Sequence, residues 1–217
     1  MNEKKEKSRI WLIILEALAV GAIAFLLCYN DLFFAINSLY TDKVYQRSRG
    51  VNQSIKIIAI DEKTIAEYGP FGAWDRSVYA DVLDKLGDYP AVVGFDIMFL
   101  SEMSEEGDEL LKEAALENGN VVFASHINFD TVVEKDANGK FAINKFYVKE
   151  VNLPFTKDEV TTGFVNVSAD EDGVVRRVIP TYRNENTDET YTGFSYEIYK
   201  KYCKNKGITP VSPKTDS

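Results

Sequence analysis

A run of 19 residues, from Ile10 to Cys28, contains one charged residue, Glu16, and shows no polar face. A helix of this length is about 28 Å long, which matches the hydrocarbon thickness of a bilayer. A cleaved signal peptide has a shorter apolar core followed by a small-residue cleavage site, and this run has neither. We therefore expect an uncleaved transmembrane helix over 10–28.

The charge differs on the two sides of this run. Residues 1–9 carry four basic and two acidic side chains, whereas residues 35–217 carry 21 basic and 30 acidic ones. Because basic flanks stay in the cytoplasm, the sequence predicts a cytoplasmic head over 1–9, a single pass through the cell membrane and an extracytoplasmic chain beyond it. The net charge of −9 argues against nucleic acid as a partner, since phosphates are neutralised by a basic surface. We expect Glu16 to lie near the interface; the alternative is a contact between helices of an oligomer.

Apolar residues recur every three or four positions beyond the membrane run: Leu32, Phe33, Ile36, Leu39, Tyr40 and Val44. This spacing predicts an amphipathic helix over 31–46, inside a juxtamembrane segment 29–50 and continuous with the membrane helix. Asn30 and Asp31 are its weak point, because both residues favour helix caps. The apolar stripe either packs on its own domain or pairs with a second copy, and we expect a homodimer.

The remaining chain alternates between strands and helices. Three apolar runs predict buried parallel strands, at 54–61, 91–99 and 120–125, and helices are expected at 62–67, 75–86 and 105–117. Two hairpins follow, with turns at 136–139 and 170–173, then a helix over 192–204 and a tail over 205–217. The fold class is therefore α/β, with a parallel-core sheet flanked by helices, an antiparallel hairpin extension and one domain over 51–204.

Two acidic residues end predicted parallel strands. Asp61 follows the first strand and Asp96 lies near the end of the second, where ligands of such sheets gather. We expect both carboxylates to be partly buried between apolar neighbours. They could hold Mg²⁺ or Ca²⁺ or act as an acid–base pair, and the alternative is that each caps a helix or fixes a loop.

Other polar residues are candidates for a binding site or a structural brace. Trp74 and Arg76 open a helix after a Gly-rich loop, with Asp75 as its N-cap, and Arg76 could reach the strand-end carboxylates. His126, the single histidine, follows the third strand. Glycine fingerprints for phosphate and His/Cys spacings for zinc are missing from the sequence, so we expect no cofactor, no metal and no catalytic residue in this chain.

Two further patterns predict structure alone. Cys28 and Cys203 show no sign of pairing with each other. The segment 170–173 matches the first half of a calcium loop, but position 179 is Ile where that pattern needs an acid, so a tight turn is expected.

An ordered series of residues along the chain carries a resemblance to a known family: Asp42, Tyr45, Arg49, Ile57–Asp61, Trp74–Arg76, Tyr79-Ala80, Val93–Phe99, Asp108, Gly163–Asn166 and Asp172–Arg177. Taken in order, these residues resemble the type-two CHASE domain, an extracytoplasmic sensory module of bacterial transmembrane receptors. The resemblance covers about 42–202 and departs from the family at Phe71-Gly-Ala-Trp74, where a Trp-Pro-Trp-like run is usual.

The resemblance implies a membrane anchor, an external sensor for a small-molecule or protein signal, and a cytoplasmic output. Outputs of the family include adenylate or guanylate cyclases, diguanylate cyclases, histidine kinases and serine/threonine kinases. The chain shows no output motif and no second apolar span, so we expect a portion of such a receptor or a sensor-only protein. The alternative function is a membrane-anchored extracytoplasmic metal-dependent hydrolase that uses Asp61 and Asp96.

Overall fold

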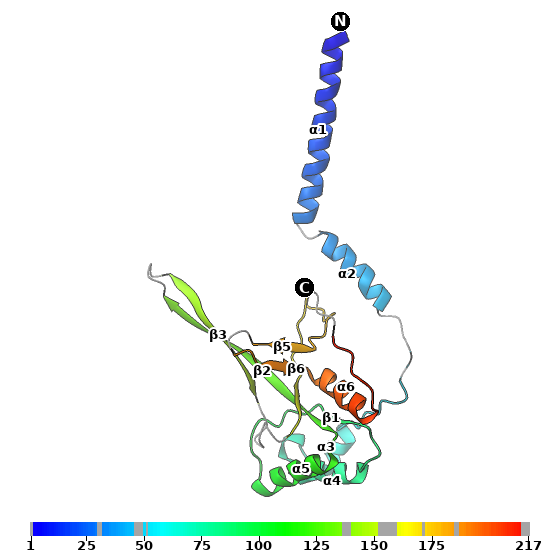
Figure 1. The fold of residues 1–217 in the computed structure, drawn as a ribbon, viewed down its shortest axis with the longest axis vertical. Helices are drawn as coiled ribbons and strands as arrows, with labels where there is room; N and C mark the ends of the chain where they lie inside the picture. The colour runs from blue at the N-terminus through cyan, green and yellow to red at the C-terminus, as the bar shows by residue number, and fades with distance from the viewer. Residues whose placement is uncertain are drawn as a thin grey trace. The chain divides into compact units, whose positions relative to one another are not determined.

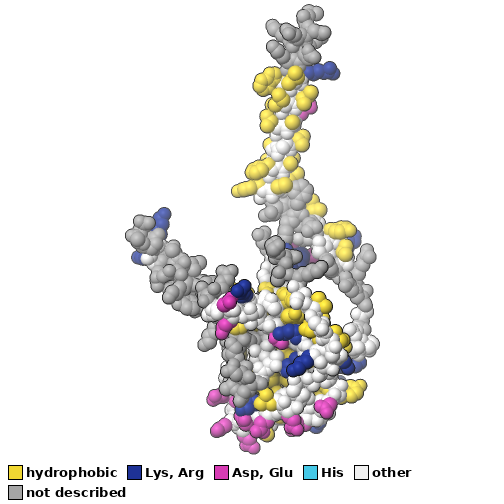
Figure 2. All heavy atoms as spheres, in the orientation of Figure 1, with side chains coloured by type: hydrophobic (Ala, Val, Ile, Leu, Met, Phe, Trp, Pro, Cys, Tyr) yellow, Lys and Arg dark blue, Asp and Glu magenta, His cyan; other side chains and the backbone are white. Residues whose placement is uncertain are grey.

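The computed structural model describes residues 2–29, 32–45, 50, 52–135, 140–151, 160–170, 172–184 and 187–213. The chain divides into two compact units, Met1–Ala59 and Ile60–Ser217. The first unit holds two helices, α1 (Asn2–Tyr29) and α2 (Leu32–Tyr45) (Figure 1). The 21 residues Arg9–Tyr29 of α1 form the one helix in the described part of the chain that is long and apolar enough to cross a membrane. Figure 2 shows apolar side chains along this helix.

Helix α2 lies where the apolar periodicity predicts it. The side chains of Ile36, Leu39 and Tyr40 on its stripe are exposed by more than half. Residues 30 and 31 lie outside the described residues, so the predicted continuity of α1 and α2 stays a prediction.

The predicted first strand at 54–61 is wrong. The segment makes a turn, in which the amide of Ile55 donates to the carbonyl of Asn52, and then runs without regular secondary structure. Ile57 and Ile58 are 87% and 69% exposed. An apolar run shows that a segment is hydrophobic, but a strand also needs a neighbouring edge for its backbone hydrogen bonds, and the run alone does not indicate one.

The second unit is built on a short parallel sheet. Strand β2 (Val121–Lys135) lies between β1 (Val93–Phe95) and β4 (Thr162–Phe164), and both neighbours are parallel to it. Phe123 pairs with Phe95 on one side and with Thr162 on the other. The two predicted strands at 91–99 and 120–125 are therefore confirmed, and β4 takes the third place in the parallel sheet.

Helices cover both faces of this sheet. Helices α4 (Ser77–Leu86) and α5 (Glu105–Asn118) pack over one face, around a buried core that includes Leu83, Phe95, Leu111 and Phe123. On the other face, α6 (Phe194–Asn205) lies directly on Gly94 and Gly163. At Gly163 an added Cβ would lie 2.5 Å from the Cα of Phe194, so only glycine permits this close approach.

The strand pairing of the first predicted hairpin is confirmed, and its predicted turn at 136–139 lies outside the described residues; the second predicted hairpin is not formed. Strand β2 continues beyond the parallel sheet and pairs antiparallel with β3 (Phe141–Val151). The turn at 170–173 is present, since the amide of Gly173 donates to the carbonyl of Asp170, but 174–179 forms no strand. The segment expected to be its partner instead forms β4, because pairing with β2 buries Phe164 to 3% exposure. The second antiparallel pair is β5 (Thr181–Arg183) with β6 (Thr190–Thr192), which the sequence analysis missed.

The remaining elements are α3 (Glu62–Tyr68) and a 3-10 turn, η1 (Phe71–Ala73), which precede α4. The four predicted helices at 62–67, 75–86, 105–117 and 192–204 are all found within two residues of their predicted ends. Cys28 is an exposed free cysteine of the first unit, and Cys203 is a buried free cysteine of the second.

Candidate functional site

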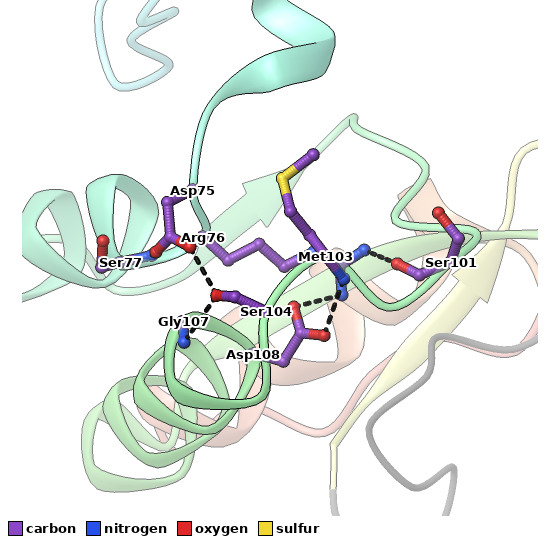
Figure 3. Close-up of polar contacts among 8 residues, drawn as sticks. All are labelled: Asp75, Arg76, Ser77, Ser101, Met103, Ser104, Gly107 and Asp108. Atoms are coloured by element: carbon purple, nitrogen blue, oxygen red, sulfur yellow. Dashed lines mark hydrogen bonds and ion pairs between the residues drawn. The ribbon is translucent and has the colours of Figure 1, made fainter.

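Arg76 is the most buried charged residue of the described chain. It immediately precedes α4 and is 4% exposed. Its guanidinium forms an ion pair with Asp108 at 2.7 Å and donates to the carbonyl of Ser101 (Figure 3). It also lies 5.1 Å from the centre of the Phe99 ring. A buried cation is costly unless its donors are paired, and here a carboxylate, a carbonyl and an aromatic face surround it.

Asp108 completes the pairing from the first turn of α5. Its second carboxylate oxygen accepts from the backbone amide of Met103 at 3.1 Å, so one side chain binds both Arg76 and the loop before α5. The loop 96–104 is thereby held at Ser101 by Arg76 and at Met103 by Asp108. Asp108 lies in the first turn of α5, where the helix dipole stabilises a negative charge.

A second set of contacts joins the beginnings of α4 and α5. Asp75 accepts from the amide of Ser77, the first residue of α4, at 2.9 Å, and from the hydroxyl of Ser104 at 2.5 Å. The N-cap position of α4 is occupied by Arg76, so the predicted N-cap at Asp75 is wrong by one residue. The Ser104 hydroxyl in turn accepts from the amide of Gly107 at 3.0 Å and caps α5 (Figure 3). The hydrogen bond from Ser104 is the main cause that lowers the pKa of Asp75, followed by the bonds from Ser77. Any side chain at Gly107 would collide with the Asp75 carboxylate.

Trp74 holds the loop 68–73 that precedes Asp75 and Arg76 in the chain. Its indole nitrogen donates to the carbonyl of Gly69 at 3.0 Å, and its ring makes edge contacts with Tyr68 and Phe71. On the inner side it contacts Tyr79, whose pKa is raised by burial. Tyr79 belongs to an aromatic cluster with Phe95, Phe99 and Phe123, so Trp74 connects the surface loop to the core.

The predicted strand-end carboxylates are not buried, and that prediction is wrong. Asp61 caps α3 and accepts from the amide and the hydroxyl of Thr64, which lower its pKa. Asp96 is exposed immediately after β1. Because Asp61 does not end a strand, the expected meeting of two carboxylates at one sheet edge has no structural basis. The carboxylate that meets Arg76 is that of Asp108.

His126 lies in β2, half-buried and opposite Val151 of β3. It is therefore part of the antiparallel pair. In the described part of the chain, no group of three or more His, Cys, Asp and Glu side chains is placed to hold a metal ion.

The contacts around Arg76 and Asp75 also include two residues, Ser104 and Asp108, that were not predicted to belong to a site. Ser104 precedes a helix with three acidic residues in its first turn, which is an N-terminal signal that could have been found. Asp108 occurs among the residues that carry the family resemblance, but no spacing indicated its pairing with Arg76, because the two residues are 32 positions apart. We name Asp75, Arg76, Ser104 and Asp108 the polar brace.

A separate acidic pair surrounds Arg176 at the turn 170–173. Its guanidinium binds Asp170 at 2.9 Å and Asp172 at 2.7 Å. The hydrogen bond from Arg176 lowers the pKa of Asp172 to about 2. Gly173 has a positive φ of 78°, as a tight turn needs, so the turn is held by an ion pair.

These observations define an α/β domain whose sheet is covered on both faces and whose chain begins with a helix that could span a membrane. Residues 17–216 match the family model of the CHASE2 domain, and the chain belongs to this family. CHASE2 domains are extracellular sensory domains of membrane receptors. No curated protein and no solved structure matches the chain.

Proposed function

We propose that the chain is the extracytoplasmic sensor portion of a bacterial transmembrane receptor, with its N-terminus in the cytoplasm. The observation that carries this proposal is the CHASE2 match over 17–216, which includes residues 17–29 of the apolar helix α1. The basic residues of 1–9 support the orientation, because basic flanks stay on the cytoplasmic side. The signal is a small molecule or a protein outside the cytoplasm.

The signal passes through the membrane in a homodimer and reaches a cytoplasmic output such as an adenylate or guanylate cyclase. A single membrane helix has little to pack against, whereas two helices can transmit a small rotation or shift. The exposed stripe residues Ile36, Leu39 and Tyr40 of α2 support such pairing next to the membrane.

The polar brace serves as a structural connection in this proposal. Arg76 is covered by Asp108, Ser101 and Phe99, so an anion from solvent would reach its guanidinium only after the loop 96–104 moves. The brace joins the N-termini of α4 and α5, and a signal that shifts one helix is therefore passed to the other.

The alternative hydrolase gains no support from its two residues. The Asp61 carboxylate is engaged by Thr64, and Asp96 is an exposed residue after β1. The sensor is accordingly the function that the chain supports best.

The topology is tested by cysteine labelling in intact cells, in a Cys28→Ser background. Tyr89 is 96% exposed, so Tyr89→Cys should react with a membrane-impermeant thiol reagent. The matched control is Lys5→Cys, which should react only after permeabilisation. The reverse pattern, with Lys5→Cys labelled in intact cells, contradicts the orientation.

The output is tested by the coding sequence that continues the receptor beyond residue 217. A nucleotide cyclase domain supports the proposed output. A kinase domain at that place contradicts the cyclase while leaving the sensor intact.

A further inference from the structure

Three aromatic residues lie together where α3 ends and the 3-10 turn η1 follows: Tyr68, Phe71 and Trp74. They are spaced three positions apart. The amide of Trp74 donates to the carbonyl of Phe71 at 3.3 Å, and residues three apart in a 3-10 turn lie on the same side. Gly69 redirects the chain after Tyr68 with a positive φ of 84°. We name Tyr68, Phe71 and Trp74 the aromatic corner.

The ring planes of the aromatic corner are steeply inclined to one another. The rings of Tyr68 and Phe71 each lie 6.1 Å from the Trp74 ring, at interplanar angles of 70° and 67°. In an edge-on pair, the ring that presents its edge keeps both of its faces uncovered by the partner. Tyr68 is 66% exposed and Phe71 is 41% exposed, so aromatic surface remains open to solvent. The face of such a ring is negative and attracts a cation.

The aromatic corner is held in place by the rest of the second unit. The indole nitrogen of Trp74 donates to the carbonyl of Gly69 at 3.0 Å and closes the loop 69–74. On the inner side, the Trp74 ring lies 6.3 Å from the ring of Tyr79, which is buried in the core. A site whose side chains are already fixed loses little conformational entropy when a ligand binds.

The side chains of 68–74 offer few groups for hydrogen bonding. They are the Tyr68 hydroxyl and the indole N–H, which already donates to Gly69. A sugar, a carboxylate or a primary amine needs hydrogen-bond partners when it leaves water, whereas a quaternary ammonium group has no N–H to satisfy. Its positive charge also matches Glu67, which adjoins the corner in α3, and the acidic surplus of residues 35–217, which carry 30 acidic and 21 basic side chains.

We propose that the aromatic corner binds the quaternary ammonium group of a small organic cation. The cation lies against the exposed faces of the rings, and Trp74 transmits its binding to the core through Tyr79. The inference deepens the proposed function, because it names the chemical class of the signal, and only its role as a signal rests on that function.

The test uses the full chain in an uncharged detergent, in a Trp11→Phe background. Trp11 and Trp74 are the two tryptophans of the sequence, so Trp74 alone then fluoresces as an indole. Choline should change the Trp74 emission in a saturable way. Its neutral isostere dimethylbutanol, in which carbon replaces the charged nitrogen, should bind roughly tenfold more weakly because it lacks the cation–π attraction. Equal binding of the two compounds, or no saturable change with choline, overturns the proposal.

A substitution at one ring tests the site itself. Tyr68→Leu should weaken choline binding roughly tenfold, since it removes an aromatic face and keeps an apolar side chain. The matched control is Tyr89→Leu, which removes a tyrosine that is 96% exposed between α4 and β1 and should bind choline like the parent chain. Circular dichroism checks that both variants are folded. Equal affinities of the folded Tyr68→Leu variant and the parent overturn the aromatic corner as the site.

Choline binding and the topology of the proposed sensor fail independently. If choline does not bind while Tyr89→Cys is labelled in intact cells, the site is overturned and the sensor remains. If choline binds while Lys5→Cys is labelled in intact cells, the site is supported and the proposed orientation is contradicted.

Discussion

At the scale of single residues, the stability of the second unit depends on how its buried charge is paired. Arg76 and Asp108 are both buried, and each side chain supplies the opposite charge that makes burial of the other tolerable. Arg183 and Asp188 form a similar ion pair, but their side chains are 70% and 76% exposed. The two pairs have the same chemistry and differ in burial, which makes them a matched comparison.

Arg76→Ala should destabilise the protein by about 3–5 kcal/mol, because it leaves the Asp108 carboxylate buried without its cation. Arg183→Ala should cost about 1 kcal/mol or less, since solvent screens an exposed pair. Urea unfolding of the full chain in detergent, followed by near-UV circular dichroism, measures both changes. Equal effects of the two substitutions would contradict the brace. An unchanged stability of Arg76→Ala together with lost signalling would instead assign Arg76 to ligand binding.

The ion pair of Arg176 predicts a dependence of stability on acid. The pKa of Asp172 is about 2 in the folded chain, below its ordinary value of 3.8. A lowered pKa contributes stability that is present above the unfolded pKa and is lost as the pH falls through the folded one. Unfolding midpoints in urea should therefore decrease between about pH 4 and pH 2, and they should decrease less in Asp172→Asn. Identical pH profiles of the two proteins would contradict this contribution.

At the scale of elements, the sequence indicated helices better than strands. Helices α4 and α5 each have an apolar face. Ser104 caps α5, and Asp75 binds the first amide of α4 from beside the N-cap position, so the local sequence marks closely where both helices begin. Strands depend on partners that local sequence does not identify. The run 54–61 is apolar and forms no strand, whereas Thr162–Phe164 becomes the third parallel strand because β2 is available beside it.

The same reasoning explains what was found and what was missed at the polar brace. Trp74 and Arg76 stand out because they follow a Gly-rich loop and precede a helix. Their partners lie on other elements, and the choice of Asp108 over Asp61 or Asp96 depends on how α5 packs on α4. Local pattern identified the cation, and only the packing of the helices identified its anion.

The contact between β4 and α6 predicts a steric effect at a glycine. In Gly163→Ala the new methyl group would lie 2.5 Å from the Cα of Phe194, and backbone cannot yield as a side chain can. The substitution should cost about 1–3 kcal/mol through displacement of α6. Gly72→Ala is the control, because nothing lies within 4 Å of its added Cβ. Thermal unfolding compares the two, and a neutral Gly163→Ala would contradict the close packing.

At the scale of the whole molecule, the question is how a change in the sensor reaches the other side of the membrane. The chain offers one apolar helix for this purpose among its described residues, followed by α2 with its exposed stripe. A rigid pair of helices carries a small rotation or shift, whereas a flexible linker would absorb it. Pairing of two copies along α2 is therefore the arrangement that the proposed receptor needs.

Single cysteines along α2 should crosslink between copies with a helical period. In a Cys28→Ser background, Ile36→Cys and Tyr40→Cys lie one turn apart on the stripe and should crosslink in native membranes, because helix neighbours recur at four residues. Thr41→Cys lies toward the opposite face and is the control. Crosslinks at all three positions would indicate random collisions, and none at any position would contradict the pairing and leave the stripe to pack on its own domain. A yield that follows the period identifies α2 as the segment through which the two copies move together.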